Sequence, residues 1–277
     1  MARMDVEWVA YTAGLKPALR RTVDPARAEE VAARMRASGA VVLRARETAV
    51  FGAREEVVLY VAPTERDAEA LRDAEASVLP GRVRAADPSG AHRAVGRALG
   101  FPACCVDAFC ARVARGVDRL VARGPGGLSE DYVAARAAWV PRPDARVNPL
   151  LMRVGAQLVS FYPCRFDCPA AVAQASALLD EVGRRSPEAA RALMAALSRS
   201  VVVAADGARA QVVLEASGRV LRVAAPSREG RAAPEDEALA AALSDATVGE
   251  TGEVRGRRDV RVEPPWCVRF GWGSSSA

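Results

Sequence analysis

Lysine, histidine and aromatic residues are scarce in this sequence. Lys16 is the only lysine among 277 residues, His92 is the only histidine, and aromatic residues make up 5% of the chain. A single histidine excludes a metal site built from several histidines, and it leaves one candidate base for a Ser-His-Asp triad. Single-strand nucleic-acid binding needs aromatic side chains interleaved with basic ones. This chain has no such stretch, so nucleic acid is a disfavoured partner. The net charge of +5 reflects an arginine-rich composition.

Long hydrophobic runs are absent too. No apolar run approaches the roughly 20 residues of a membrane-spanning helix, and the first residues lack the apolar stretch of about 7–15 residues that marks a secretory signal. We therefore expect a cytoplasmic protein without a membrane partner. No glycine-rich dinucleotide motif and no P-loop lysine occurs, so nothing favours classical nucleotide binding.

The hydrophobic pattern predicts an α+β protein in three parts. Residues 1–88 read as a small α/β unit, whose order of helices and strands suits a sheet with helices on one face. Residues 89–199 read as a helical region that bears cysteines, with one helix expected over 148–160, beginning at Asn148. Residues 200–277 are β-rich: a β-meander, a short helix, and a further strand around 258–263.

The six cysteines are concentrated in one part of the chain. None occurs in the first 103 residues, five fall between 104 and 168, and Cys267 stands alone near the end. An intracellular compartment keeps thiols reduced, so structural disulfides are not expected. Cysteines that served only as small core residues would not cluster so tightly, so the clustering favours a shared functional site.

The first candidate motif is GFPACCVDAFC, residues 100–110. Pro102 suits the first position of a helix, so Cys104 and Cys105 are expected in the first turn. The backbone N–H groups at a helix start and the positive end of the helix dipole favour a thiolate over a thiol. The thiolate is the form that binds metal.

The second candidate motif is YPCRFDCP, residues 162–169. Pro169 again suits a first helical position, which places Cys168 at or next to the N-cap and Cys164 on the entering loop. Two cysteine pairs, with Cys105 and Cys164 59 residues apart, therefore each open a helix. We predict that Cys104, Cys105, Cys164 and Cys168 bind one metal or cofactor.

Four thiolates suit tetrahedral zinc or an iron–sulfur cluster. Adjacent cysteines are expected to strain a single-ion site, which favours a cluster, with 4Fe-4S as the expected composition, over zinc. Three or four of the cysteines would be ligands, and two separate sites stay open. Cys267 is a candidate for an additional, distant ligand, whereas Cys110 is expected to be a core residue.

The strings LGFPACCVDAF and NPLLMRVGAQLVSFYPCRFDCPAAVAQA resemble a cysteine-rich family of microbial proteins with no established activity. In that family a Gly-aromatic-Pro-x-Cys-Cys-x-x-x-Phe segment precedes a Pro-Cys-x-x-x-Cys segment. The resemblance covers about 80 of the 277 residues, and it implies a paired-cysteine site without implying a reaction. A histidine of the family's pattern would fall near Phe161 or Tyr162, and neither residue replaces it as a metal ligand.

Three further residues are candidates for a supporting role at the site. His92, Asp107 and Arg165 could donate a proton, tune the thiolates or hold a substrate carboxylate, although His92 also suits a surface position. The leading hypothesis is an iron–sulfur enzyme with an open coordination site, acting in redox, lyase or sulfur-transfer chemistry on a small-molecule substrate or with an electron donor. The alternatives are a non-catalytic, zinc-stabilised binding module and a thiol–disulfide redox protein.

Overall fold

The computed structural model of the chain describes fourteen stretches of residues. These are 4–45, 49–51, 54–78, 88–114, 129–152, 155–206, 208–214, 220–225, 227–228, 231–232, 234–243, 246–249, 254–255 and 266–270. Helices and antiparallel sheets together confirm the predicted α+β class. The chain divides into two compact units, Met1–Ala111 and Arg112–Ala277. The three-part division at residues 88 and 199 stays a prediction.

The first unit is built on a small antiparallel sheet in the order β1-β4-β2, with β3 paired to β4. Its elements are α1 (Val6–Thr12), β1 (Leu19–Val23), the 3-10 helix η1 (Pro25–Arg27), α2 (Ala28–Arg36), β2 (Val41–Arg44), β3 (Ala49–Phe51), β4 (Arg54–Ala62), α3 (Glu65–Ala76), α4 (Pro88–Ala98) and α5 (Ala103–Ala114). The sequence pattern alone does not indicate α1 or β1.

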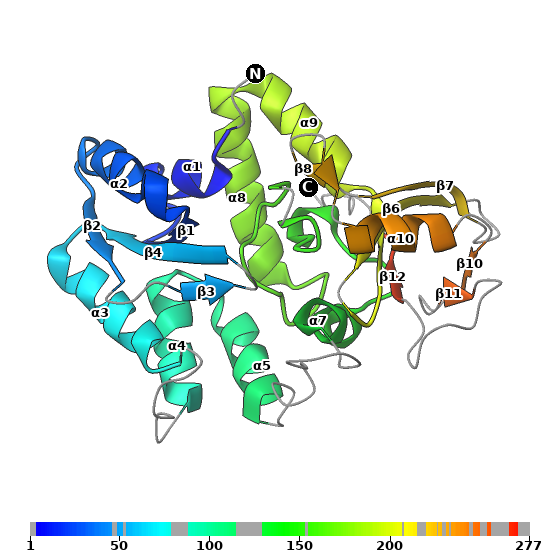
Figure 1. Ribbon diagram of the computed structural model, residues 1–277, viewed down its shortest axis with the longest axis horizontal. Coiled ribbons are helices and arrows are strands. Elements are labelled where there is room, and N and C mark those ends of the chain that lie inside the picture. The colour runs from blue at the N-terminus through cyan, green and yellow to red at the C-terminus, as the bar shows by residue number, and fades with distance from the viewer. Residues whose placement is uncertain are drawn as a thin grey trace. The chain divides into compact units, whose positions relative to one another are not determined.

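Helices cover both faces of this sheet, and not one face as the sequence suggested (Figure 1). The reason lies in β4, whose residues from Val57 onward are buried on both sides. Val57, Leu59 and Val61 pack into the cluster that includes α2, whereas Val58 and Tyr60 pack into the cluster that includes α3. A strand buried on both faces reads as a continuous apolar run, and such a run requires two covering layers.

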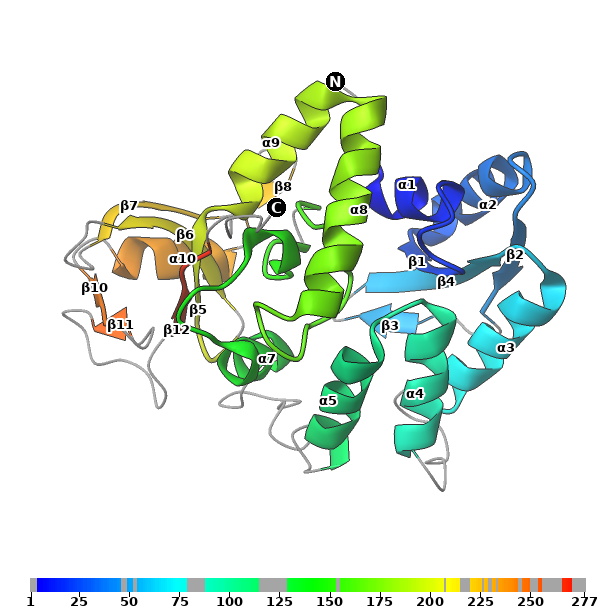
Figure 2. The same cartoon turned by 180° about the vertical axis from the view of Figure 1, so that it is seen from behind.

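The second unit combines helices with a four-stranded antiparallel sheet in the order β12-β5-β6-β7. Its elements are α7 (Glu130–Ala138), the 3-10 helix η2 (Ala145–Val147), α8 (Pro169–Arg185), α9 (Pro187–Leu197), β5 (Ser200–Val203), β6 (Arg209–Leu214), β7 (Val220–Ala224), β8 (Ser227–Arg228), β9 (Arg231–Ala232), α10 (Pro234–Ala242), β10 (Thr247–Val248), β11 (Val254–Arg255) and β12 (Trp266–Val268). Helices α8 and α9 lie side by side, joined at Ser186 (Figure 2).

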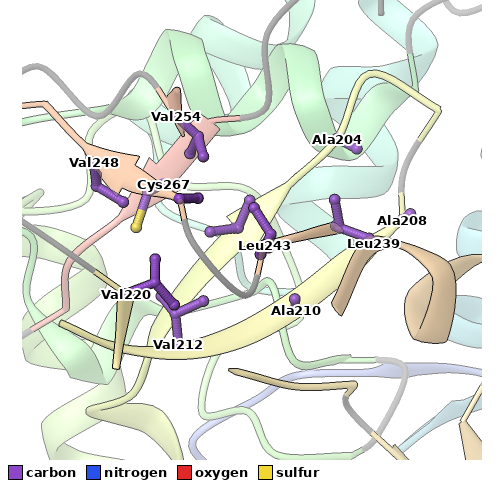
Figure 3. Packing of buried hydrophobic residues seen from close by; sticks show 12 residues of the cluster. Ala204, Ala208, Ala210, Val212, Val220, Leu239, Leu243, Val248, Val254 and Cys267 are labelled. Atoms are coloured by element: carbon purple, nitrogen blue, oxygen red, sulfur yellow. The ribbon is translucent and has the colours of Figure 1, made fainter. Parts of the chain in front are cut away.

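The predicted β-meander corresponds to β5, β6 and β7, and the short helix after it to α10. The C-terminal strand β12 extends this sheet by pairing with β5. The strand expected around 258–263 lies outside the described residues. Alanine, valine and leucine side chains fill the core on this sheet, where Cys267 lies among them (Figure 3).

The helix expected over 148–160 is wrong, because the described residues of this stretch form turns, bends and irregular chain, with no α-helix among them. Asn148 is fully buried and extended, and its side chain accepts a hydrogen bond from the Leu150 N–H (3.0 Å) while donating to the Leu197 carbonyl (3.0 Å). Further along the stretch, Gly155 has a positive φ of 66°. Buried side-chain to backbone bonds of this kind compete with helix formation.

Candidate metal centre

The first cysteine pair follows a complete helix-capping turn between α4 and α5. The Phe101 N–H donates to the Gly96 carbonyl (2.9 Å), and the Gly100 N–H donates to the Arg97 carbonyl (2.9 Å). These two bonds form a Schellman motif, which needs a left-handed residue at its fifth position. Gly100 supplies it with a φ of 74°. The glycine of the GFPACC string therefore ends one helix immediately before the next begins.

A second segment of the first unit packs on this turn. A Cβ at Gly100 would lie 2.6 Å from Cδ of Pro17, so the two chain segments touch at a position where only glycine fits. The adjacent Lys16 lies 5.4 Å over the Phe101 ring, and its ammonium pairs with Glu7 at 2.5 Å. Lys16 is only 6% exposed, and a desolvated cation over an aromatic ring contributes about 2 kcal/mol. These contacts fix where α5 begins.

Cys104 and Cys105 are the second and third residues of α5, in its first turn as predicted. The Pro102 carbonyl accepts the first helical bonds, from the N–H groups of Cys105 (2.9 Å) and Val106 (3.0 Å). In this helical turn the two adjacent sulfur atoms lie 4.0 Å apart. Cys104 is exposed, whereas Cys105 is buried. Adjacent cysteines can therefore present both sulfurs at one place.

The second cysteine pair lies on a loop that Phe166 anchors. Its side chain is fully buried and meets Phe270 edge-on, with ring centroids 5.2 Å apart. Its backbone N–H donates to the Ala138 carbonyl at the end of α7 (2.8 Å), and its carbonyl accepts from the Asp144 N–H (2.7 Å). The residue midway between the two cysteines is thus held by both its side chain and its backbone.

Cys168 is the N-cap residue of α8, and Pro169 occupies the first helical position, as the sequence predicts. The Cys168 side chain makes no capping hydrogen bond within α8. Its N–H donates to the Arg165 carbonyl (3.1 Å), which closes the turn from Arg165 to Cys168, directly after Cys164. Cys168 is buried and Cys164 is partly buried.

The structure brings these four cysteines together. The sulfur atoms of Cys104, Cys105, Cys164 and Cys168 all lie within 4.8 Å of one another, an arrangement compatible with metal binding. Thiolates bind zinc and iron–sulfur clusters in preference to hard cations. The four sulfurs differ in exposure, since two are buried, one is partly buried and one is exposed.

Arg165 and Asp167 lie between the two cysteines of the second loop. The Arg165 guanidinium donates two hydrogen bonds to the Asp167 carboxylate, at 2.9 and 2.7 Å, and both side chains reach solvent. The hydrogen bond that Arg165 donates to Asp167 raises the pKa of Arg165, with smaller contributions from the charges of Asp167, Cys164 and Cys168. Arg165 therefore places a permanent positive charge near two of the sulfurs.

The other two predicted supporting residues have partners of their own. Asp107 forms an ion pair with Arg93 (3.1 Å) on the surface of α5, one turn after Cys104. His92 is half-buried and meets the Phe109 ring edge-on, with centroids 5.0 Å apart. These contacts join α4 to α5, and a role of His92 or Asp107 at the sulfurs stays a prediction.

Cys110 and Cys267 are not among the four grouped cysteines. Cys110 is 1% exposed, and its sulfur lies 3.5 Å from the Ser89 carbonyl, in agreement with the expected core role. Cys267 is completely buried in the aliphatic core of the second unit (Figure 3), where burial raises its pKa to about 12. A neutral thiol in an apolar core is a poor ligand, so this structure gives no support to Cys267 as an additional one.

Sequence reasoning missed the residues that hold the first turn in place. Lys16 and Glu7 precede the cysteines by about 90 residues, and no local pattern links them to the motif. The one available signal was that Lys16 is the only lysine in an arginine-rich chain.

Comparison with known proteins adds no relative. No protein-family model, no curated protein and no solved structure matches the chain. Within the described stretches, no helix combines the length and apolarity needed to cross a membrane.

Proposed function

We propose that the four cysteines hold one tetrahedral metal ion, with zinc as the best candidate, and that this ion stabilises the fold. The observation that carries the proposal is the spacing of the sulfurs. Among the residues that the structure describes, the donor set is composed of four thiols without an oxygen or nitrogen ligand, as in structural zinc sites made of four cysteines.

The distances favour one ion over a cluster. Four sulfurs around one zinc at bond lengths of about 2.3 Å lie about 3.8 Å apart by tetrahedral geometry. The Cys104–Cys105 separation of 4.0 Å is close to this value, and the group as a whole stays within 4.8 Å. A four-iron cluster places two metal atoms between any two thiolates, and therefore spreads the sulfurs farther apart.

The local electrostatics suit such a centre. Four thiolates and one divalent cation carry a net charge of −2, which needs compensation where two of the sulfurs are buried. The first turn of α5 and the N-cap of α8 supply positive helix ends. Arg165 supplies a full positive charge beside Cys164 and Cys168. A closed shell of four thiolates leaves no open position on the metal, which favours a structural role over catalysis at the ion.

A second candidate is the iron–sulfur enzyme that the sequence favours. The exposed position of Cys104 supports it, because release of one ligand would open a coordination site to solvent. In that case three cysteines would bind the cluster, and a small molecule would reach the fourth position. Sulfurs within 4.8 Å also suit the third hypothesis, a metal-free thiol–disulfide protein.

Metal analysis distinguishes these three functions. Protein purified without oxygen would be assayed for zinc, iron and acid-labile sulfide, and its visible spectrum recorded. We expect one zinc per chain and no colour. Cobalt substituted for zinc should give the intense visible bands of a tetrahedral thiolate site. Iron and sulfide in near-equal amounts would instead establish a cluster, and a chain without metal whose thiol count changes with reductant would establish thiol redox chemistry.

A further inference from the structure

We propose that Cys104 is the reactive ligand of the metal centre, and that its alkylation by a soft carbon electrophile releases the metal. This inference rests on the proposed function and adds a reaction to it. The centre would then respond to electrophiles through one exposed sulfur.

The exposure of the cysteines carries the inference. All six lie within the described residues, and Cys104 alone is exposed. Cys164 is partly buried, and the remaining cysteines are at most 3% exposed. In a substitution at carbon, the sulfur attacks the carbon from the side opposite the leaving group. The reagent therefore needs open space in front of the sulfur. Of the four sulfurs in the group, that of Cys104 therefore offers the best approach.

The neighbours of Cys104 on α5 are consistent with such an approach. Its neighbour Ala103 is exposed and has the smallest side chain after glycine. Asp107, one turn further along α5, is also exposed, and its carboxylate is directed to Arg93. Cys105, in the same turn, is only 2% exposed. Two adjacent cysteines thus have opposite accessibility.

The reaction balances without an oxidant. A metal-bound cysteine is already a thiolate, which is the nucleophilic form. Its sulfur forms a bond to carbon, the bond from that carbon to the leaving group breaks, and the leaving group departs with the electron pair. The product is a neutral thioether, so the ligand set loses one negative charge. Because a thioether binds zinc far more weakly than a thiolate, the metal becomes exchangeable.

The experiment treats zinc-loaded protein with less than one equivalent of iodoacetamide at neutral pH. Peptide mass analysis locates the label, and a chromogenic chelator follows zinc release. We expect the first label on Cys104 and zinc release in proportion to it. Cys104→Ser should lose the fast labelling phase. Cys110→Ser, which alters a buried cysteine outside the group, should keep it.

Two outcomes would overturn the inference. In one, the first label lies on Cys164 or is spread over several cysteines; in the other, Cys104 is labelled while zinc stays bound. Both are read on wild-type protein, so they do not depend on the folding of a variant. Zinc content measured before the reagent is added tests the proposed function separately, since a metal-free chain would refute that function and the inference together.

Discussion

Cysteine occupies two very different environments in this protein. At the starts of α5 and α8, cysteines lie in polar, partly exposed turns beside charged residues, with four sulfurs within 4.8 Å. In the sheet of the second unit, Cys267 lies fully buried among valine, leucine and alanine side chains (Figure 3).

This difference teaches that position, more than residue type, decides what a thiol does. A helix start supplies N–H groups and a favourable dipole, which stabilise negative sulfur. An aliphatic core stabilises the neutral thiol and raises its pKa, as for Cys267. Four predictions test the comparison, from the largest expected effect to the smallest.

The largest effect is expected where a buried sulfur of the group is replaced. Cys105→Ser and Cys168→Ser should each abolish stoichiometric metal binding, a larger loss than the roughly 10–100-fold that removal of an outer contact costs. Metal content after gel filtration checks this. Cys110→Ser is the control, because Cys110 is equally buried but stands outside the group. Metal loss in that control alone would mean that the ligands are wrongly assigned.

A glycine substitution should separate backbone strain from placement of the cysteines. Gly100→Ala and Gly39→Ala both put alanine at a positive φ, at an expected cost of about 1–2 kcal/mol in unfolding free energy. Only Gly100→Ala also drives a Cβ against Pro17, 2.6 Å away, whereas Gly39 faces open space.

We therefore expect Gly100→Ala alone to weaken metal binding, measured by chelator competition beside urea unfolding. Equal metal affinity in the two variants would show that the Pro17 contact has no influence on the cysteine pair.

Replacing Cys267 should change how the free energy of unfolding depends on pH, without changing metal binding. Its pKa is raised from 9.0 to about 12, so the folded chain keeps the thiol proton that the unfolded chain loses. Between these values the free energy of unfolding should fall as pH rises, by up to about 1.4 kcal/mol per pH unit. Cys267→Ala should remove this contribution and leave metal content unchanged. Denaturant titrations from pH 8 to pH 11 measure how the free energy of unfolding changes with pH in the wild type and in the variant. Equal slopes in the two proteins would contradict the raised pKa of Cys267.

The smallest effect is expected at Arg165. Arg165→Gln removes the positive charge near Cys164 and Cys168, but because Arg165 is exposed, the loss of metal affinity should stay below about tenfold. Salt should shrink the difference. Arg36→Gln removes an exposed arginine from a comparable surface pair with Glu29 and should leave metal affinity at the wild-type value. An equal effect in both variants would attribute the change to net charge.

Local patterns predicted much of the fold and the local setting of both cysteine pairs. The sequence TERD at residues 64–67 indicates a capped helix start. In the structure the Thr64 side chain accepts a hydrogen bond from the Asp67 N–H (3.2 Å) at the start of α3. Pro169 marks the start of α8 for the same local reason. The position of each cysteine pair at a helix start could be predicted, because both motifs carry their helix-start signals within a few residues.

Long-range contacts decided what the sequence could not predict. Asn148 resembles a helix cap, but its side chain bonds to Leu197 49 residues away and the helix does not form. The pairing of β12 with β5 joins segments more than 60 residues apart. No window of neighbouring residues contains that information.

The spacing of the cysteines along the chain has a consequence for biosynthesis. Cys104 precedes Cys168 by 64 residues, so at about 5–20 residues per second a ribosome would need roughly 3–13 s between the two. For that interval the first pair of thiols exists without the second, on a nascent chain. If one ion binds all four, metal loading is a late event in synthesis, and the first pair of thiols is open to oxidation or to the wrong metal until the start of α8 has left the ribosome.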